Sequence, residues 1–461
     1  MSALGAIGPT TSKVPQIFPA QRMGSEDALR HYQAVQALGW YSVRDPAFGA
    51  KGNNADDDTQ AFQAAIDTAP DGSTVYVPPC DPRKAYIISS LTIKKPLTLL
   101  GSPGLGSLLK GKKGAAGYML NISGFPVGAT LGPEGHLQGV YVQGLRLEGN
   151  LRQPSYGAMS LAALEHSTVQ DLIIESFAME ALDLFSSVRE CVFRNIHMRF
   201  CGDRDTNTPA INLYDRSAQD RGPGTDAHNL LHFDQVFSVF PYGDHFLLDT
   251  IAGKPRFWVR DIKISNSILH GILPGVNSIG NPVPTVGQQA CRHFVVKGAT
   301  HVTLDHVTSL VAGTGVPFIA VLPSAGGLRP QHLLIDSFYA AGRYAYSGDQ
   351  TGIDLTVGDL TLEHSYITGN QTAAVRAAAG TTVRLGDGNN FGFQPVIING
   401  SSASRFYGIV TLDSPKFNQG TVGGGAATLG ANCPAGTPAA PYTWLKVLSS
   451  DNSVVYIPCW R

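Results

Sequence analysis

Residues 48–69, FGAKGNNADDDTQAFQAAIDTA, place three consecutive aspartates, Asp56, Asp57 and Asp58, directly before an alanine-rich segment. Asp57 lies where a helix N-cap is expected: its side chain can accept a hydrogen bond from a free amide of the first turn, and Gln60 can bond back to it as in a capping box. Negative charge at a helix start also interacts favourably with the helix dipole. The triplet therefore predicts the start of a helix and not a catalytic or metal-binding cluster.

After this helix the sequence changes to short runs of β-forming residues separated by turns. From residue 139 to about residue 415 these runs recur loosely, roughly every 20–35 residues, as in GVYVQGLRLEGN, STVQDLIIESF and THVTLDHVTSLVAG. Each run has an apolar-x-apolar core, and the Asn-Gly signals of tight hairpins are scarce. The pattern predicts an all-β fold, a right-handed parallel β-helix (solenoid) with coils ~4.8 Å apart, short N-terminal capping helices and a C-terminal β-hairpin extension.

Three regions are expected along the chain. Residues 1–45 form an N-terminal arm with a short amphipathic helix over 25–38, which serves as an attachment segment or a cap. Residues 46–415 form the parallel β-helix. Residues 416–461 form a small-residue linker and a β-hairpin for capping or oligomerisation, in which Trp444, Lys446 and Leu448 face Val454, Tyr456 and Pro458.

The segment from Tyr41 to about residue 105 carries a family resemblance. It reads YSVRDPAFGAKGNNADDDTQAFQAAIDTA, then GSTVYVPP, YIISSLTI and LTLLGSPG, and it resembles the opening segment of β-helix proteins of the pectate lyase superfamily. It departs from the usual pattern in the insertion of Pro46-Ala47 and in Gly52-Asn53-Asn54, where that family has Gly-Asp-Gly. The resemblance implies that Asp57-Asp58-Thr59 belongs to the N-terminal cap and that the substrate is a polysaccharide. Lyases, hydrolases, phage tailspikes and epimerases share this opening, so the activity stays open.

Bulk composition excludes some classes of protein. The 34 basic and 35 acidic residues nearly cancel, which argues against a protein that coats nucleic acid or an anionic membrane. No apolar run reaches the length of a transmembrane helix, and the N-terminus shows no secretory signal. The six cysteines show no zinc-site spacing; the pairs to examine first for disulfides are Cys191/Cys201 and Cys433/Cys459.

Candidate catalytic residues concentrate in the charged segment 201–229, which departs most from the repeat. Glycoside hydrolysis needs two carboxyl groups, and a lyase needs a base beside a uronate. We take as catalytic candidates Asp203, Asp205, Asp215 and Asp244, and as substrate-binding candidates Arg204, Arg216, Tyr242 and His245. The structural alternatives are a solvated loop of Asp–Arg pairs, a turn-capping aspartate at position 244, and aromatic side chains that pack against the solenoid.

Glu180 and Asp183, in AMEALDLF, form a third candidate pair, for which a structural role is the alternative. The polygalacturonase-type set of motifs is not present, so catalytic residues of that family cannot be carried over. We predict no metal site and no cofactor, although a lyase would bring in Ca²⁺ as a candidate.

Three functions remain in view. The first is a phage or prophage tailspike, a homotrimer in the virion tail that contacts other phage tail proteins and binds and depolymerises a bacterial surface polysaccharide. The second is a secreted bacterial enzyme, pectate-lyase-like or polygalacturonase-like, that degrades an acidic polysaccharide. The third is a non-catalytic receptor-binding β-helix. Oligomeric state separates the first two, and release of oligosaccharides separates both from the third.

Overall fold

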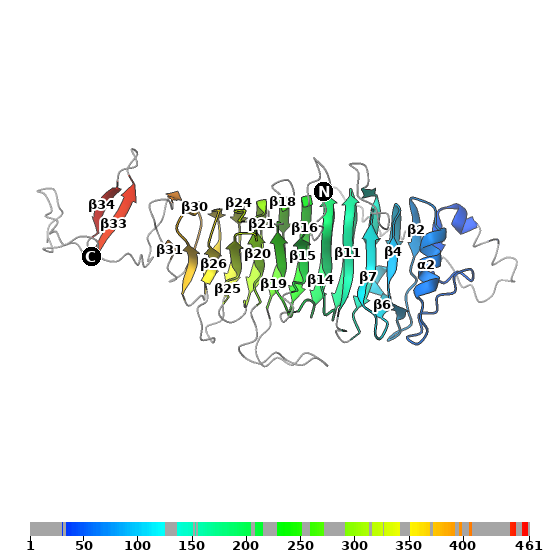
Figure 1. The fold of residues 1–461 in the computed structure, drawn as a ribbon. Coiled ribbons are helices and arrows are strands. Elements are labelled where there is room, and N and C mark those ends of the chain that lie inside the picture. Colours follow the sequence, from blue (N-terminus) through cyan, green and yellow to red (C-terminus); the bar gives the residue numbers. More distant parts are fainter. Residues whose placement is uncertain are drawn as a thin grey trace, which may run out of the picture.

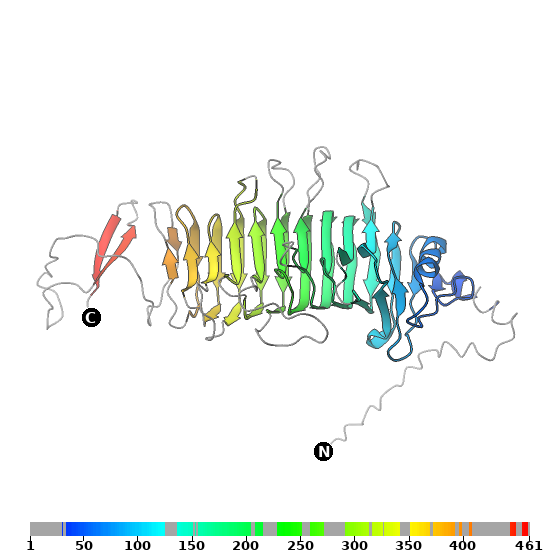
Figure 2. The same cartoon turned by 60° about the horizontal axis from the view of Figure 1, so that its bottom comes forward.

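The chain forms a parallel β-helix in which strands from successive coils lie side by side along one long axis (Figures 1 and 2). This computed structural model describes residues 30, 34–124, 136–150, 153, 155–203, 208–214, 228–250, 259–271, 291–312, 316–325, 327–341, 351–368, 372–391, 396–398, 405–407, 443–448 and 454–459. The predicted parallel β-helix is confirmed.

Three ladders of parallel strands make up the walls of the solenoid. The first ladder contains β1 Trp40–Ser42, β2 Ser73–Tyr76, β5 Leu97–Leu100, β9 Val140–Gln143, β18 Val259–Ser265, β21 Thr300–Asp305, β24 Gln331–Asp336, β27 Asp359–Glu363, β30 Thr382–Leu385 and β32 Arg405–Tyr407. The second contains β3 Tyr86–Ile88, β6 Ser107–Gly111, β10 Leu145–Glu148, β19 Ile268–His270, β22 Thr308–Leu310, β25 Tyr339–Ala341 and β28 Tyr366–Thr368. Long strands β12 Thr168–Glu175, β14 Val192–Arg199 and β16 His228–Val239 join these two ladders.

The third ladder carries the candidate site. It contains β4 Leu91–Ile93, β7 Gly117–Ser123, β11 Tyr156–Glu165, β13 Leu182–Arg189, β15 Ile211–Tyr214, β17 Phe246–Asp249, β20 Phe294–Lys297, β23 Ile319–Leu322, β26 Thr351–Leu355, β29 Ala373–Ala377 and β31 Val396–Ile398. The short strand β8 Leu137–Gln138 pairs with the end of β11.

Apolar side chains alternate into the interior, as the apolar-x-apolar pattern predicts. In β5, for example, Leu97 and Leu99 are fully buried, and the residues between them are not. Aromatic rings stack from coil to coil inside the solenoid: the ring centroids of Phe193 and Phe233 lie 4.6 Å apart. The interior therefore forms one continuous hydrophobic core that grows coil by coil.

Helix α2, Thr59–Thr68, lies beside β2 and β4 at the N-terminal end of the solenoid (Figure 1). It buries Phe62, Ala65 and Ile66 and so covers the end of the core. The predicted cap needs a correction of one residue: the N-cap position is Asp58, whose backbone carbonyl accepts from the amide of Phe62 while its carboxylate makes no bond to the helix. The predicted bond from the Asp57 side chain to an amide of the first turn is present, since Asp57 Oδ1 accepts from the amide of Thr59. A 3₁₀ turn, η2, spans Pro103–Leu105.

All three aspartates of the triplet have structural partners. Asp57 accepts from the amide of Thr59 at 3.0 Å and pairs with Lys112 at 2.8 Å. Asp58 accepts from the amides of Lys51 and Gly52 at 2.6 and 3.1 Å. Asp56 accepts from the Asn53 amide side chain and pairs with Lys51. The structural interpretation of the triplet is thereby supported residue by residue.

Two smaller predictions concern the hairpin and the cysteines. Strands β33 Thr443–Leu448 and β34 Val454–Cys459 are antiparallel, and their register pairs Trp444 with Pro458, Lys446 with Tyr456 and Leu448 with Val454, as predicted. Cys191 and Cys201 are free thiols, so the first disulfide candidate is wrong, and Cys433 lies outside the described residues.

The predicted N-terminal helix is described only in part, since residues 34–37 are helical and residues 25–29 and 31–33 lie outside the described set. Among the helices of the described part, none is long and apolar enough to pass through a bilayer.

Candidate functional site

Glu180 and Asp183 meet around one tyrosine hydroxyl on the outer side of the third ladder. The Oη atom of Tyr118 lies 2.7 Å from Oε2 of Glu180 and 2.8 Å from Oδ2 of Asp183. These two carboxyl oxygens are therefore at most 5.5 Å apart, the sum of the two distances. Both acidic residues are only 1% exposed. Two buried carboxyl groups in contact with one shared group form the kind of cluster that supplies a general acid and a general base.

The alternation of β13 positions Asp183. Its neighbours Leu182 and Leu184 are fully buried in the core, so the side chain between them points out of the solenoid. On the next coil Asn212 pairs with Asp183 in register, and its Nδ2 donates to Oδ1 of Asp183 at 2.9 Å. Ser160 of β11 occupies the same column on the coil before. A column of polar side chains thus crosses three adjacent strands.

The Oδ1 atom of Asn212 is buried and accepts no hydrogen bond from the described residues. A buried amide oxygen without a donor costs free energy, and it is the feature that a ligand hydroxyl can satisfy. The site therefore presents two carboxyl groups and one buried acceptor within a few ångströms of each other.

Gly157 allows Tyr118 to reach the acid pair. Tyr118 and Gly157 pair in register on β7 and β11, and the amide of Ala158 donates to the carbonyl of Glu180 at 2.9 Å, which places Glu180 one coil beyond Gly157. A Cβ on Gly157 would lie 2.4 Å from the Tyr118 ring. Tyr118 therefore extends across the coil of Gly157 because that position carries no side chain. Figure 1 shows β7, β11 and β15 in this order along the solenoid.

The pKa of the Tyr118 hydroxyl is raised far above its usual value. Burial is the largest cause, followed by the charges of Asp183 and Glu180. The phenol therefore keeps its proton at neutral pH. It can donate a hydrogen bond to a carboxylate, but it is poorly suited to be the base of a lyase reaction.

The predicted residues Asp203 and Asp244 lie on the coils that follow. Asp203 precedes β15, and its backbone exchanges hydrogen bonds with Thr208 at 2.8 and 2.6 Å. Asp244 stands two residues before β17, as Glu180 stands two residues before β13. The Asp244 carboxylate is buried and paired with Arg292, whose Nη2 lies 2.6 Å from Oδ2. This ion pair suits a structural role for Asp244.

Tyr242 is half-buried, and its ring centroid lies 6.4 Å from that of Phe200. His245 has no exposed surface, and its ring packs against His293 at 4.5 Å, a position that suits a core residue. The remaining predicted site residues lie outside the described residues and stay predictions: Arg204, Asp205, Asp215 and Arg216.

Sequence reasoning identified Glu180 and Asp183 as a pair but missed Tyr118, Gly157 and Asn212. Tyr118 is 62 residues from Glu180 and 65 from Asp183, across coils of unequal length. No local motif marks such a contact. The only signal in the sequence is a polar residue inside an otherwise apolar run, as in GYMLNIS and INLY.

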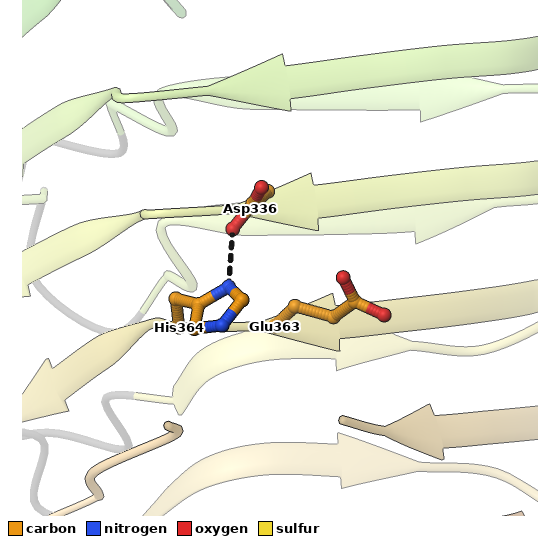
Figure 3. Close-up of side chains that lie close together, drawn as sticks. All are labelled: Asp336, Glu363 and His364. Carbon is orange, nitrogen blue, oxygen red and sulfur yellow. Dashed lines mark hydrogen bonds and ion pairs between the residues drawn. The ribbon is translucent and has the colours of Figure 1, made fainter. Parts of the chain in front are cut away.

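A second cluster, Asp336, Glu363 and His364, brings one ligand atom from each residue within 4.8 Å of the others (Figure 3). The three side chains come from neighbouring coils, and Nδ1 of His364 lies 3.0 Å from Oδ1 of Asp336. His364 is exposed and the two acids are half-buried. These residue types can hold a divalent cation. An ordinary surface ion pair accounts for their contact equally well, so the cluster adds nothing to the choice of function.

Comparison with known proteins agrees with this class of molecule, a parallel β-helix with a pectate lyase-like N-terminal segment. Residues 40–133 match the family model described as "Rhamnogalacturonase A/epimerase, pectate lyase-like", which confirms the resemblance for that segment. A curated relative, "Depolymerase 1, capsule K30/K69-specific" of Klebsiella phage K5-2, is 37% identical over 98 residues. The matched part is 21% of this chain and 12% of that relative.

Solved structures share the fold. ORF18 of Geobacillus virus E2 superposes with a TM-score of 0.57 at 16% identity and covers 83% of this chain, which in turn covers 63% of that one. The A-module of the mannuronan C-5 epimerase AlgE4 of Azotobacter vinelandii gives a TM-score of 0.50 at 14% identity, with 80% and 94% covered. At these identities the likeness shows the β-helix and nothing about the chemistry.

Proposed function

We propose that this protein is a tailspike-like depolymerase that hydrolyses glycosidic bonds of a bacterial surface polysaccharide, with Glu180 and Asp183 as its acid pair. The observation that carries the proposal is the pair of buried carboxyl groups that share the Tyr118 hydroxyl. The likeness of the N-terminal segment to a phage capsule depolymerase supports a polysaccharide substrate.

The chemistry follows from what glycoside hydrolysis requires. One carboxyl group donates a proton to the leaving glycosidic oxygen, and the other, ionised, activates water or attacks the sugar itself. Asn212 orients Asp183 through its hydrogen bond at 2.9 Å, and Tyr118 fixes the second oxygen of Asp183 and one oxygen of Glu180. Fixing the reacting groups in this way lowers the entropic cost of reaching the transition state.

Hydrolysis fits this site better than β-elimination does. A lyase of this kind uses a base to abstract a proton beside a uronate, often with Ca²⁺ to neutralise the acid. The raised pKa of Tyr118 opposes that role. We therefore expect depolymerisation to persist in EDTA and the products to lack the ultraviolet absorbance of unsaturated uronates.

We extend the proposal to assembly and location: a homotrimer in a virion tail, in contact with other tail proteins. The phage origin of the curated relative supports this. A secreted bacterial enzyme is the alternative. Native mass spectrometry tests it, since a trimer is expected and a stable monomer would favour the bacterial enzyme.

The test of function uses purified capsule or lipopolysaccharide from a panel of strains and measures the release of reducing ends. Wild type is expected to release them from at least one strain, whereas Glu180→Gln and Asp183→Asn release none above background. Glu175→Gln, at another buried acid, is the matched control and should retain activity. Binding without release by wild type would favour the non-catalytic receptor-binding β-helix.

A further inference from the structure

We propose that copies of this protein associate side by side through one face of the solenoid, the outer side of the second ladder from the end of β16 to β28. This face, called the uncharged face below, names the contact of the homotrimer proposed above. It rests on that proposed assembly for the number of copies, and it does not depend on the acid pair.

Each of the five strands of this face directs two side chains outward. One column consists of Phe237, Ile268, Thr308, Tyr339 and Tyr366, which follow one another in register. The second column lies two residues further along each strand and runs in register from Val239 to Thr368. None of these ten side chains is Asp, Glu, Lys or Arg.

Large apolar side chains of the uncharged face lie in water. The residue between the two outward positions is fully buried, as Leu269 is in β19 and Ile367 in β28. Ile268, Tyr339 and Tyr366 point the other way and are 38%, 43% and 38% exposed. Several exposed apolar side chains on one face are typical of an interaction surface.

The same ladder is charged in its N-terminal half. The column that contains Val239 continues backwards through Arg199, Glu175, Glu148 and Lys110, one charged residue on each coil. These side chains form ion pairs within the chain, such as Lys110 with Glu148 at 3.1 Å. The outer side of the second ladder therefore changes from charged to uncharged at β16.

The other two faces of these coils carry charges. On the first ladder, Asp305, Asp336 and Glu363 follow one another in register and point outward. On the third ladder, Asp249 stands beside Lys297 in register, with their charged groups 3.5 Å apart. Among the described residues of these coils, the second ladder alone has an outer face without Asp, Glu, Lys or Arg.

The lack of charge favours a second copy of this chain as the partner. In a closed ring whose axis runs along the solenoid, every copy turns the same face toward the axis, so residues near the axis meet their own copies. Like charges would repel one another there, whereas apolar side chains gain by leaving water. A different protein could instead match a charged face with opposite charges.

The geometry of the two tyrosines argues against a polysaccharide on this face. The rings of Tyr339 and Tyr366 stack with centroids 5.3 Å apart and an angle of 6° between their planes. The C–H groups of a sugar are attracted to the negative face of an aromatic ring, and here the two rings turn faces toward each other. The exposed ring edges suit contact with apolar side chains of another chain.

Native mass spectrometry of the full chain tests the contact. The double variant Ile268→Lys, Tyr339→Lys is expected to be monomeric at a concentration where wild type is fully trimeric. The matched control is Ile173→Lys, Leu334→Lys: Ile173 lies in the same column before β16, and Leu334 points outward on the first ladder. The control should stay trimeric. A monomeric wild type, or a face variant as trimeric as the control, would overturn the proposal.

Cross-linking tests the same contact without added charge, and so covers the case in which the double variant fails to fold. Thr308→Cys, in the middle of the uncharged face, should give a covalent dimer band with a short bismaleimide, beyond any that the native cysteines of wild type give. Thr303→Cys, on the first ladder of the same coil, should give none. Equal bands for the two variants would contradict the assignment of this face.

Release of reducing ends keeps this proposal separate from the proposed function. A wild-type trimer that the face variant dissociates, but that releases nothing from any polysaccharide, overturns the hydrolysis and supports the contact. A face variant that remains trimeric but no longer binds polysaccharide assigns the uncharged face to the sugar and overturns the contact.

Discussion

Two buried acidic sites lie within eight residues of each other along the chain and differ in their partners. Glu175, at the end of β12, accepts from Nη2 of Arg146 at 2.8 Å and from Nε of Arg199 at 2.7 Å. Glu180 and Asp183, at the start of β13, share the hydroxyl of Tyr118. Both sites are almost closed to solvent. At Glu175 two guanidinium groups contact one carboxylate, whereas at the second site two carboxyl groups contact one phenol hydroxyl.

The difference shows that burial alone does not mark a catalytic acid. A carboxylate held by two arginines joins three strands, which is a structural role. Glu180 and Asp183 instead bring two carboxyl groups to one hydroxyl, the arrangement that acid–base chemistry on a sugar needs. The chemistry of the partner therefore distinguishes the two sites.

The largest predicted effect comes from substitutions at Glu180 and Asp183, which leave the Glu175 site unchanged. Glu180→Gln and Asp183→Asn should each lower kcat by about 10²–10⁴-fold, because each removes one half of the general acid–base pair. The melting temperature should change little, since both substitutions keep the shape of the side chain. Rates of reducing-end release on a susceptible polysaccharide measure this, and equal rates for wild type and both variants would contradict the assignment.

The converse experiment substitutes Glu175 and measures stability. Glu175→Gln should lower the free energy of unfolding by about 2–3 kcal/mol, because it leaves Arg146 and Arg199 without their shared charge. Denaturant unfolding measures the loss. Glu190→Gln is the matched control, since Glu190 forms an exposed pair with His166 and should matter by less than about 0.5 kcal/mol. If Glu175→Gln lowers the free energy of unfolding as little as Glu190→Gln does, the structural role given to Glu175 is wrong.

Two buried histidines, His293 and His245, make the stability of the protein depend on pH in the acidic range. Burial lowers the pKa of His293 to about 3 and lowers that of the adjacent His245 well below its usual value. As pH falls below ~6.5 the unfolded chain binds protons that the folded chain does not, so stability present at neutral pH is lost progressively toward pH 3, at about 1.4 kcal/mol per pH unit for each histidine.

His293→Phe should remove the contribution of one histidine, about 1.4 kcal/mol per pH unit, from the loss of stability toward acidic pH. Phenylalanine is chosen because the next coil carries Phe318 against the same ring. Unfolding free energies at pH 6 and pH 5 measure it. An unchanged slope in the variant would show that His293 is not protonated on unfolding over this range.

The smallest predicted effects on stability come from substitutions in the aspartate triplet, and they differ between Asp58 and Asp56. Asp58→Ala should cost about 1–2 kcal/mol, because the amides of Lys51 and Gly52 lose their acceptor. Asp56→Ala should cost less than about 0.5 kcal/mol, since its ion pair with Lys51 is exposed. Thermal unfolding of the two variants checks the order, and the reverse order would contradict the structural role given to Asp58.

Much of the fold could be predicted because it depends on local patterns. Alternating apolar residues predicted the strands, and the alternation in TWLKVL and VVYIPC predicted the hairpin register. The position of the cap differed by one residue because the side chain that accepts from the first helical amide belongs to Asp57, whereas the helix itself begins directly after Asp58.

The site could be predicted only in part. Glu180 and Asp183 are near neighbours in sequence, but the sequence offered them only as a third candidate pair, behind the segment 201–229 and Asp244. Their contact with Tyr118 depends on coil lengths and on the lack of a side chain at Gly157, which are properties of the assembled solenoid. The same holds for Asp244, whose partner Arg292 is 48 residues away.

A crystal structure of the Glu180→Gln variant with an oligosaccharide from a susceptible strain shows whether substrate binds at the Tyr118 cluster. We expect a glycosidic oxygen within hydrogen-bond distance of the side chain at position 180 or of Asp183, with a sugar hydroxyl donating to Oδ1 of Asn212. Sugar rings bound elsewhere, with none at the Tyr118 cluster, would contradict it.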